Sequence, residues 1–115
     1  MILQVDIEKT EPNMAVVNFT GALTLGTSLL TADSKLQQTI REGFSRLVLN
    51  MAGVPYLDSA GLGVLVQTSG LAREHGGELR MCGVSERVAS LVKMTRTDEL
   101  LPMDLDVDAS RAALA

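Results

Sequence analysis

The sequence predicts one small α/β domain in which helices pack on a mixed β-sheet. The chain has 115 residues, the usual size of one compact domain. Hydrophobic residues make up 46% of it, which is enough for a core, and aromatic residues only 3%, so the core must be built mainly from aliphatic side chains and Met. Strand-like and helix-like segments alternate along most of the chain, and this alternation indicates partly parallel strand pairing.

The first elements form a predicted β-hairpin. Leu3, Val5 and Ile7 alternate with polar residues, as in a half-buried strand. After the turn cluster 10–13, strand-forming residues resume over 14–20. Two such segments separated by a short turn predict an antiparallel pair.

A loop over 21–26 leads into the first predicted helix. Thr27 or Ser28 can cap this helix, and Gly43 ends it. Apolar residues spaced three and four apart predict its buried stripe, which consists of Leu29, Ala32, Leu36 and Ile40.

A strand, a helix and a second strand follow. The apolar segment 46–51 is typical of a central strand, and 78–82 reads as another strand. Between them Ser59 opens a helix that Gly76 and Gly77 stop. The predicted inner side of this helix consists of Leu62, Leu65, Val66, Ser69 and Ala72.

The last third of the chain predicts one more helix and a short tail. Ser85 caps the helix, whose inward residues are Val88, Leu91 and Val92. The tail from Asp104 holds a short strand and a final helix over 108–114. The predicted order is therefore β-β-α-β-α-β-α plus a short tail strand and helix, in a single domain over 1–115 with no linker or repeat.

Composition and charge argue against several classes of protein. The net charge is −4, whereas a nucleic-acid surface needs clustered basic residues. No apolar run reaches the ~18–20 residues that span a bilayer. The N-terminus lacks the pattern of a signal peptide, and Cys82 is the single cysteine. We expect a cytoplasmic protein with no nucleic-acid partner and no direct membrane insertion.

Enzymatic interpretations of the segment "VLNMAGVPYLDSAGLGVLV" fail on particular residues. A nucleophile elbow needs Gly where Leu57 stands, and a dinucleotide fingerprint needs Gly where Val66 stands. The single histidine, His75, follows Ser59 by 16 residues, or about 24 Å along one helix. The sequence has no Walker motif and no paired metal ligands, so we predict no enzyme, no catalytic residue and no metal site.

The glycines of this segment distinguish it from an ordinary helix start. Asp58 and Ser59 are favoured N-cap residues, worth ~0.5–2 kcal/mol. Gly61 and Gly63 in the opening turns could cost up to ~2 kcal/mol and cancel that gain. Glycine persists where another backbone, a ligand or a partner comes close. We interpret the segment as an accessible helix start kept bare for approach.

At these residues the sequence resembles the STAS family, and more closely its stand-alone bacterial anti-sigma factor antagonists. The specific part is "LVLNMAGVPYLDSAGLGVLV", supported by "NFTGALT" and "HGGELRMCGVSERVASLVKMT". The similarity extends over nearly the whole chain. It implies a small α/β domain and a regulatory, non-enzymatic role.

The resemblance further implies that Ser59 is phosphorylated by the partner, an anti-sigma factor with a GHKL-type kinase fold. That partner holds the ATP and magnesium, so this chain needs no cofactor. The unphosphorylated chain binds the anti-sigma factor and frees the sigma factor, and a PP2C-type phosphatase resets the cycle.

Three positions depart from the family pattern. Thr24 stands where an acid is common, and Ala60 stands where a second serine is common. The usual Gly-Leu after the third helix is absent, and 95–100 read Thr-Arg-Thr-Asp-Glu-Leu. Partner choice or phosphorylation rate depends on such differences.

The predicted partner-contact residues lie in the loop after the second strand and at the start of the second long helix. Two interpretations of Asp58 remain open. It caps the helix or orients Ser59, or it contacts the partner. The full predicted set is Thr24, Leu25, Gly26, Asp58, Ser59, Ala60, Gly61 and Leu62.

Two other functions remain as alternatives. The same fold could be an accessory subunit of a stressosome-like or lipid-transport complex, with Ser59 only a helix cap. A small-ligand sensor has no positive feature in the sequence. We expect a monomer or weak dimer, an inert buried thiol at Cys82, and a helix-terminal role for His75.

Overall fold

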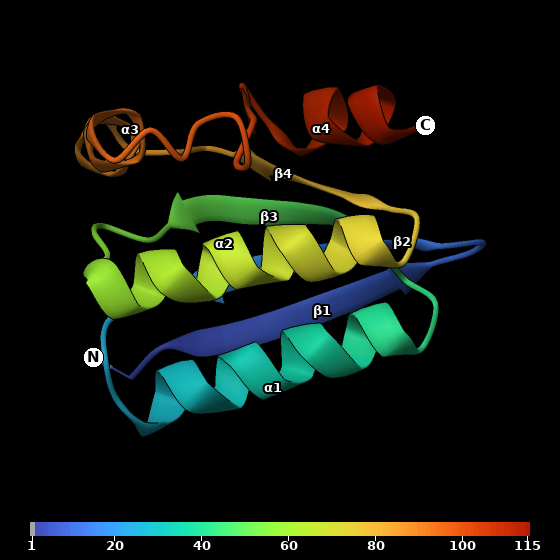
Figure 1. The fold of residues 1–115 in the computed structure, drawn as a ribbon, viewed down its shortest axis with the longest axis horizontal. Coiled ribbons are helices and arrows are strands. Elements are labelled where there is room, and N and C mark those ends of the chain that lie inside the picture. Colours follow the sequence, from blue (N-terminus) through green and yellow to red (C-terminus); the bar gives the residue numbers. More distant parts are fainter. Residues whose placement is uncertain (1) are drawn as a thin grey trace.

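Five strands form one mixed sheet in the computed structural model, which describes residues 2–115 (Figure 1). The strands lie side by side in the order in which they follow along the chain. The first pair is antiparallel, and every later pair is parallel. The predicted hairpin and mixed sheet are therefore confirmed. The strands are β1 (Gln4–Thr10), β2 (Met14–Thr20), β3 (Arg46–Gly53), β4 (Glu78–Cys82) and β5 (Met103–Asp104).

Four helices cover the two faces of this sheet. Three of them connect parallel strands, and since such crossovers are right-handed, three successive ones in the same direction place their helices on one face. Figure 1 shows α1 and α2 side by side in front of the sheet. α4 packs on the opposite face. The helices are α1 (Thr27–Arg41), α2 (Ser59–Glu74), α3 (Glu86–Met94) and α4 (Val107–Leu114).

The alternation of side chains along the central strands divides the core in two. Successive residues of a strand point to opposite faces of the sheet. In β3, Leu47 and Leu49 join the main core beneath α1, α2 and α3, whereas Val48 faces Leu114 of α4. Both clusters are mainly aliphatic, as the composition predicts, with Phe19 and Phe44 as the aromatic side chains of the main cluster. β3 extends two residues beyond the predicted 46–51 and ends at Gly53.

The buried stripes of the helices largely match their spacing. All four predicted residues of α1 are buried. In α2 and α3 the predicted residues are also buried except Val66 and Leu91, which are half-buried at the edges of their stripes. Gly43 and Gly76 follow the ends of α1 and α2 in left-handed conformations, with φ of +106° and +80°.

The predicted cap of α1 is wrong. The helix begins at Thr27, so the N-cap position belongs to Gly26, which has no side chain to accept a hydrogen bond. Thr27 and Ser28 lie inside the first turn. The cap of α3 is confirmed, because the Ser85 hydroxyl accepts a hydrogen bond from the Val88 amide (3.2 Å). α4 begins one residue earlier than predicted, and Asp106 caps it.

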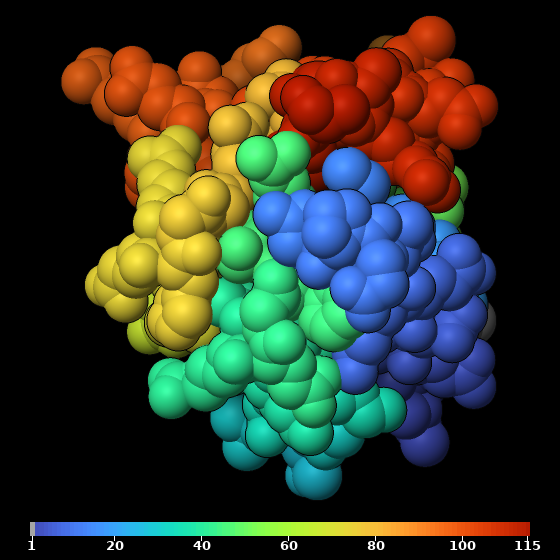
Figure 2. Space-filling model, turned by 90° about the vertical axis from the view of Figure 1, so that its right-hand side faces the viewer, coloured from blue at the N-terminus to red at the C-terminus, as the bar shows by residue number. Residues whose placement is uncertain are grey.

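The structural interpretations of His75 and Cys82 are confirmed. His75 is the C-cap residue of α2, and its Nδ1 lies 3.0 Å from the carbonyl oxygen of Leu71. Cys82 is buried between the sheet and α4, and burial raises the pKa of its thiol. Figure 2 shows the end of the molecule where α2 terminates, beside the β1–β2 turn and the end of α4. None of the helices within residues 2–115 combines the length and the hydropathy that crossing a bilayer requires.

A polar network attaches the C-terminal elements to the sheet. Arg80 of β4 donates two hydrogen bonds to Asp104 of β5, at 2.7 and 3.0 Å. The Ser110 hydroxyl of α4 donates to the same carboxylate (2.8 Å). The bonds from Arg80 hold the pKa of Asp104 below its ordinary value of 3.8. One carboxylate therefore connects β4, β5 and α4.

We expect Asp104→Asn to lower the free energy of unfolding by ~1–3 kcal/mol at neutral pH, because it removes the charged acceptor of two Arg80 hydrogen bonds and leaves Glu78 as the remaining charged partner of the guanidinium. A depressed folded-state pKa gives stability that is present above the unfolded pKa and lost as pH falls through the folded one. The difference between wild type and variant should therefore shrink as the pH falls below 3.8. Urea unfolding at several pH values measures it.

Lys9→Gln is the matched control, because it removes an ion pair with Glu42 that is exposed on both sides. It should change stability little. Equal losses in the two variants would contradict the role of the Asp104 network.

Candidate functional site

Two segments far apart in the sequence meet at the carboxyl ends of β2 and β3, on the left in Figure 1. Leu23 and Leu57 form a single parallel bridge there. The Leu23 amide donates to the carbonyl of Tyr56, and the Leu23 carbonyl accepts from the amide of Asp58, both at 3.2 Å. The loop after β2 therefore lies against the junction of β3 and α2, which confirms the predicted proximity of these segments.

Asp58 connects the two segments through both of its carboxylate oxygens. Oδ1 accepts from the backbone N–H of Gly61 (2.9 Å), which makes Asp58 the N-cap of α2. Oδ2 accepts from the backbone N–H of Leu25 (2.9 Å). These bonds, first the one from Leu25 and then the one from Gly61, lower the pKa of Asp58. Of the roles considered for Asp58, capping is confirmed, and fastening the Leu25 loop is a role that sequence reasoning missed.

Ser59 is the first residue of α2, and its side chain is exposed. Since Asp58 is the cap, the interpretation of Ser59 as the helix cap is wrong. Its hydroxyl is held at the start of the helix and is accessible from outside. His75 lies at the opposite end of α2, as the spacing predicts.

The exposed residues around Ser59 define what we call the Ser59 surface. Leu25 is 77% exposed, which is unusual for leucine. Gly26 is exposed, and Thr24 and Ala60 are half-buried. The Ser59 surface consists of Thr24, Leu25, Gly26, Ser59 and Ala60. It combines one apolar side chain with one accessible hydroxyl.

Two further residues of the predicted contact set lie below this surface. Gly61 is buried, and Leu62 is only 8% exposed and joins the main core. They support the Ser59 surface from beneath, and their own contact with a partner stays a prediction.

The two glycines in the opening turns of α2 have different environments, and at Gly61 the group that comes close is the chain's own loop rather than a partner. A Cβ on Gly61 would lie 2.0 Å from the carbonyl oxygen of Leu23, so this glycine makes room for the chain's own loop. A Cβ on Gly63 would meet no other segment within 4 Å. Within residues 2–115, close approach requires glycine at Gly61, and clearance for a partner at Gly63 stays a prediction.

The electrostatic setting of Ser59 is that of a helix N-terminus. The backbone N–H groups at the start of α2 carry partial positive charge, and no acidic residue lies in the first turn. The neighbouring Asp58 carboxylate is engaged with two amides. An anion attached to Ser59 Oγ would be attracted by the positive end of α2 and repelled by one neighbouring carboxylate, that of Asp58.

Two exposed apolar residues on neighbouring elements were missing from the predicted set. Leu30 of α1 is 63% exposed, and the sequence could have indicated it, because it lies about 100° from the buried Leu29 around the helix. Tyr56 is 40% exposed, and the Arg87 guanidinium lies 4.8 Å from its ring centre. No local signal pairs Tyr56 with a residue of α3.

Comparison with known proteins identifies a family over most of the chain. The model of the STAS domain matches residues 4–110. The match includes all five strands and the whole Ser59 surface.

Curated relatives of this chain are regulatory proteins. The anti-sigma F factor antagonist of Paenibacillus polymyxa is 28% identical over 110 residues, which cover 95% of this chain and 93% of the relative. The anti-sigma-B factor antagonist of Bacillus subtilis strain 168 is 30% identical over 101 residues, or 88% of this chain and 90% of the relative.

A solved structure with the same fold is the anti-sigma factor antagonist SpoIIAA. Its unphosphorylated form has a TM-score of 0.81 at 14% identity, with 96% of both chains covered. Its phosphorylated form, from Bacillus, has a TM-score of 0.76 at 12% identity, with 96% of this chain and 99% of that chain covered. At these identities the likeness establishes the fold.

We expect opposite effects from alanine at the two glycines in the opening turns of α2. Gly61→Ala should destabilise the protein by ~1–3 kcal/mol or more, since the new methyl group overlaps the Leu23 carbonyl. Gly63→Ala should stabilise it by ~0.5–1 kcal/mol, because it only improves helix propensity. Urea unfolding of both variants measures the difference, and two changes of the same sign would refute the close approach at Gly61.

The hydrogen bonds of Asp58 can be tested by amide exchange. Asp58→Ala should speed hydrogen exchange at the amides of Leu25 and Gly61, because both lose their acceptor. Asp106→Ala, which removes the cap of α4, is the control and should leave these two amides unchanged. Unaltered exchange at Leu25 in Asp58→Ala would show that the loop is held by other contacts.

Proposed function

The chain belongs to the STAS domain family, and from this premise we propose that it is a non-enzymatic regulatory protein that binds an anti-sigma factor. In this proposal the unphosphorylated chain occupies the anti-sigma factor and frees the sigma factor. Phosphorylation of Ser59 abolishes the binding. The names of the curated relatives, both anti-sigma factor antagonists, support the partner class.

The proposed partner phosphorylates Ser59 itself. It is an anti-sigma factor with a GHKL-type kinase fold, which brings its own ATP and magnesium. A PP2C-type phosphatase restores the free hydroxyl. This chain then needs no cofactor, and it acts in the cytoplasm, where its partners act.

The observation that carries the proposal is the exposed hydroxyl of Ser59 beside an exposed Leu25. The helix is capped by Asp58, so Ser59 is not needed for that purpose. A serine that is accessible and has no capping duty at a helix start fits a phosphate acceptor. The exposed Leu25 side chain supplies apolar area that a partner can cover.

A phosphate at Ser59 should affect the stability of the fold much less than the affinity for the partner. The phosphate adds about 1.5–2 negative charges at the positive end of α2, where an anion is tolerated. Across a closed interface the same charge would lose its water without a cation to replace it, at a cost of several kcal/mol. A cost of ~3 kcal/mol weakens binding about a hundredfold. The domain stays folded while the complex dissociates.

We expect Ser59→Ala to bind the anti-sigma factor constitutively and Ser59→Asp to bind at least about tenfold more weakly than wild type, because the added charge has no partner in the interface. Both variants should melt within a few degrees of wild type. Isothermal titration calorimetry and thermal unfolding measure the two quantities.

Ser34→Asp is the matched control, because it adds the same charge at an exposed serine in the middle of α1, far along the helix from the Leu25 loop. It should bind like wild type. In parallel, incubation with the anti-sigma factor, ATP and magnesium should add one phosphate, which Ser59→Ala prevents. Equal affinity of Ser59→Asp and wild type, or a phosphate at another residue, would overturn the proposal.

A further inference from the structure

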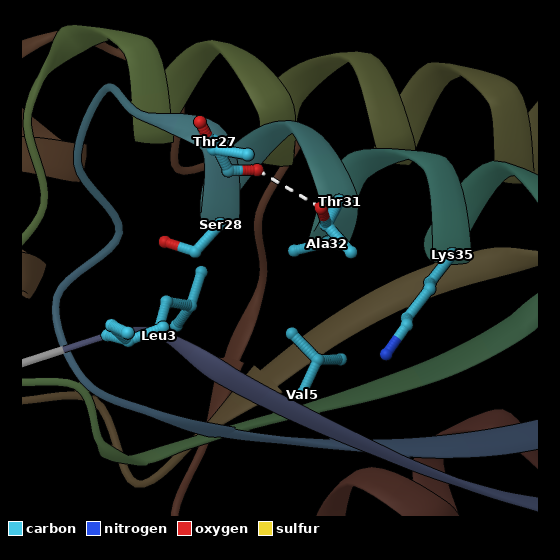
Figure 3. A pocket seen from close by; sticks show the side chains of 8 residues that line it. Leu3, Val5, Thr27, Ser28, Thr31, Ala32 and Lys35 are labelled. Carbon is cyan, nitrogen blue, oxygen red and sulfur yellow. Dashed lines mark hydrogen bonds between the residues drawn. The ribbon is translucent and has the colours of Figure 1, made fainter.

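A pocket of about 540 Å³ lies between the start of β1 and the first turns of α1 (Figure 3). Its floor is apolar and consists of Leu3 and Val5 from the first strand segment and Ala32 from α1. No residue of the Ser59 surface lines it. The volume falls within the ~300–1,000 Å³ typical of small-molecule sites.

The polar groups of the pocket are few and come from one side. Thr27, Ser28, Thr31 and Lys35 of α1 line it above the apolar floor. The Thr31 hydroxyl donates to the Thr27 carbonyl (3.1 Å), so its hydrogen is already used. The Lys35 side chain extends along the pocket toward β1, as Figure 3 shows. Among residues 2–115, Lys35 is the one cationic side chain that lines the pocket.

The Lys35 ammonium has no carboxylate within 4.0 Å among residues 2–115, where the ion pairs involve Lys9 and Arg80. An apolar floor with one unpaired cation at its end matches a ligand with one anionic head and an aliphatic body. A dicarboxylate would place its second charge on the apolar floor, where no cation balances it.

We propose that this pocket binds an aliphatic monocarboxylate, with its carboxylate on Lys35 and its chain on the floor formed by Leu3, Val5 and Ala32. Ser28 and Lys35 are seven residues apart, which is about 10 Å along α1 and suits a chain of about eight carbons. The exposed Ile2 side chain borders the pocket and can cover the end of the chain.

The test is an NMR titration of the full chain with sodium octanoate below its micelle concentration. Saturable shifts should appear at the amides of Leu3, Val5, Ala32 and Lys35. Affinity should rise about two- to fourfold for each methylene added between hexanoate and octanoate, as more chain leaves water. Octyltrimethylammonium, with the same chain and the opposite charge, should bind at least about fivefold more weakly.

Two variants locate the site. Lys35→Gln should weaken octanoate about two- to fivefold, the size of one solvent-exposed ion pair. Lys93→Gln, an exposed lysine of α3, is its matched control and should change nothing. Ser28→Leu narrows the pocket and should abolish saturable shifts, with circular dichroism confirming the fold.

Three results would each overturn the inference: no saturable shift up to the solubility limit, equal binding of both head groups, or an unchanged affinity in Lys35→Gln. Octanoate binding should be the same in Ser59→Asp, because Ser59 does not line the pocket. The test of octanoate binding is therefore independent of the test of phosphorylation at Ser59.

Discussion

The two hydrogen bonds of the Asp58 carboxylate are the interactions on which the candidate site depends. One oxygen caps α2 at Gly61, and the other holds the amide of Leu25 in a loop 33 residues earlier in the chain. Because a single rigid group makes both bonds, the start of α2 and the loop after β2 keep a constant relation to each other. The exposed hydroxyl and the exposed leucine are presented together as a result.

Gly61 allows the loop after β2 to lie close to the start of α2. The Leu23 carbonyl, which accepts from the Asp58 amide, occupies the space that a side chain at position 61 would fill. The loop can therefore press directly on the first turn of α2. Close packing of backbone against backbone leaves the polar groups of both segments satisfied and the surface above them free. Gly63, two residues later, has no such neighbour.

The interactions that stabilise the folded domain lie away from the Ser59 surface. The aliphatic core lies between the sheet and α1, α2 and α3, and a second cluster with the Arg80–Asp104 network fixes α4 on the other face. A charge added at Ser59 touches neither. The core and the Ser59 surface are thus separate enough for a modification at Ser59 to change the surface and spare the fold, which is the property that the proposed switch requires.

Local patterns in the sequence determined the strands, the helix stripes and the start of α2 at Ser59, because side-chain periodicity and capping act within a few residues. Tertiary structure alone decided the hydrogen bond from the Leu25 amide to Asp58 and the clearance at Gly61, because each depends on a loop 33 to 38 residues away. It also decided the pocket beside Lys35, whose walls come from β1 and α1. The spacing of residue types along one helix or strand does not indicate which distant segment of backbone packs against it.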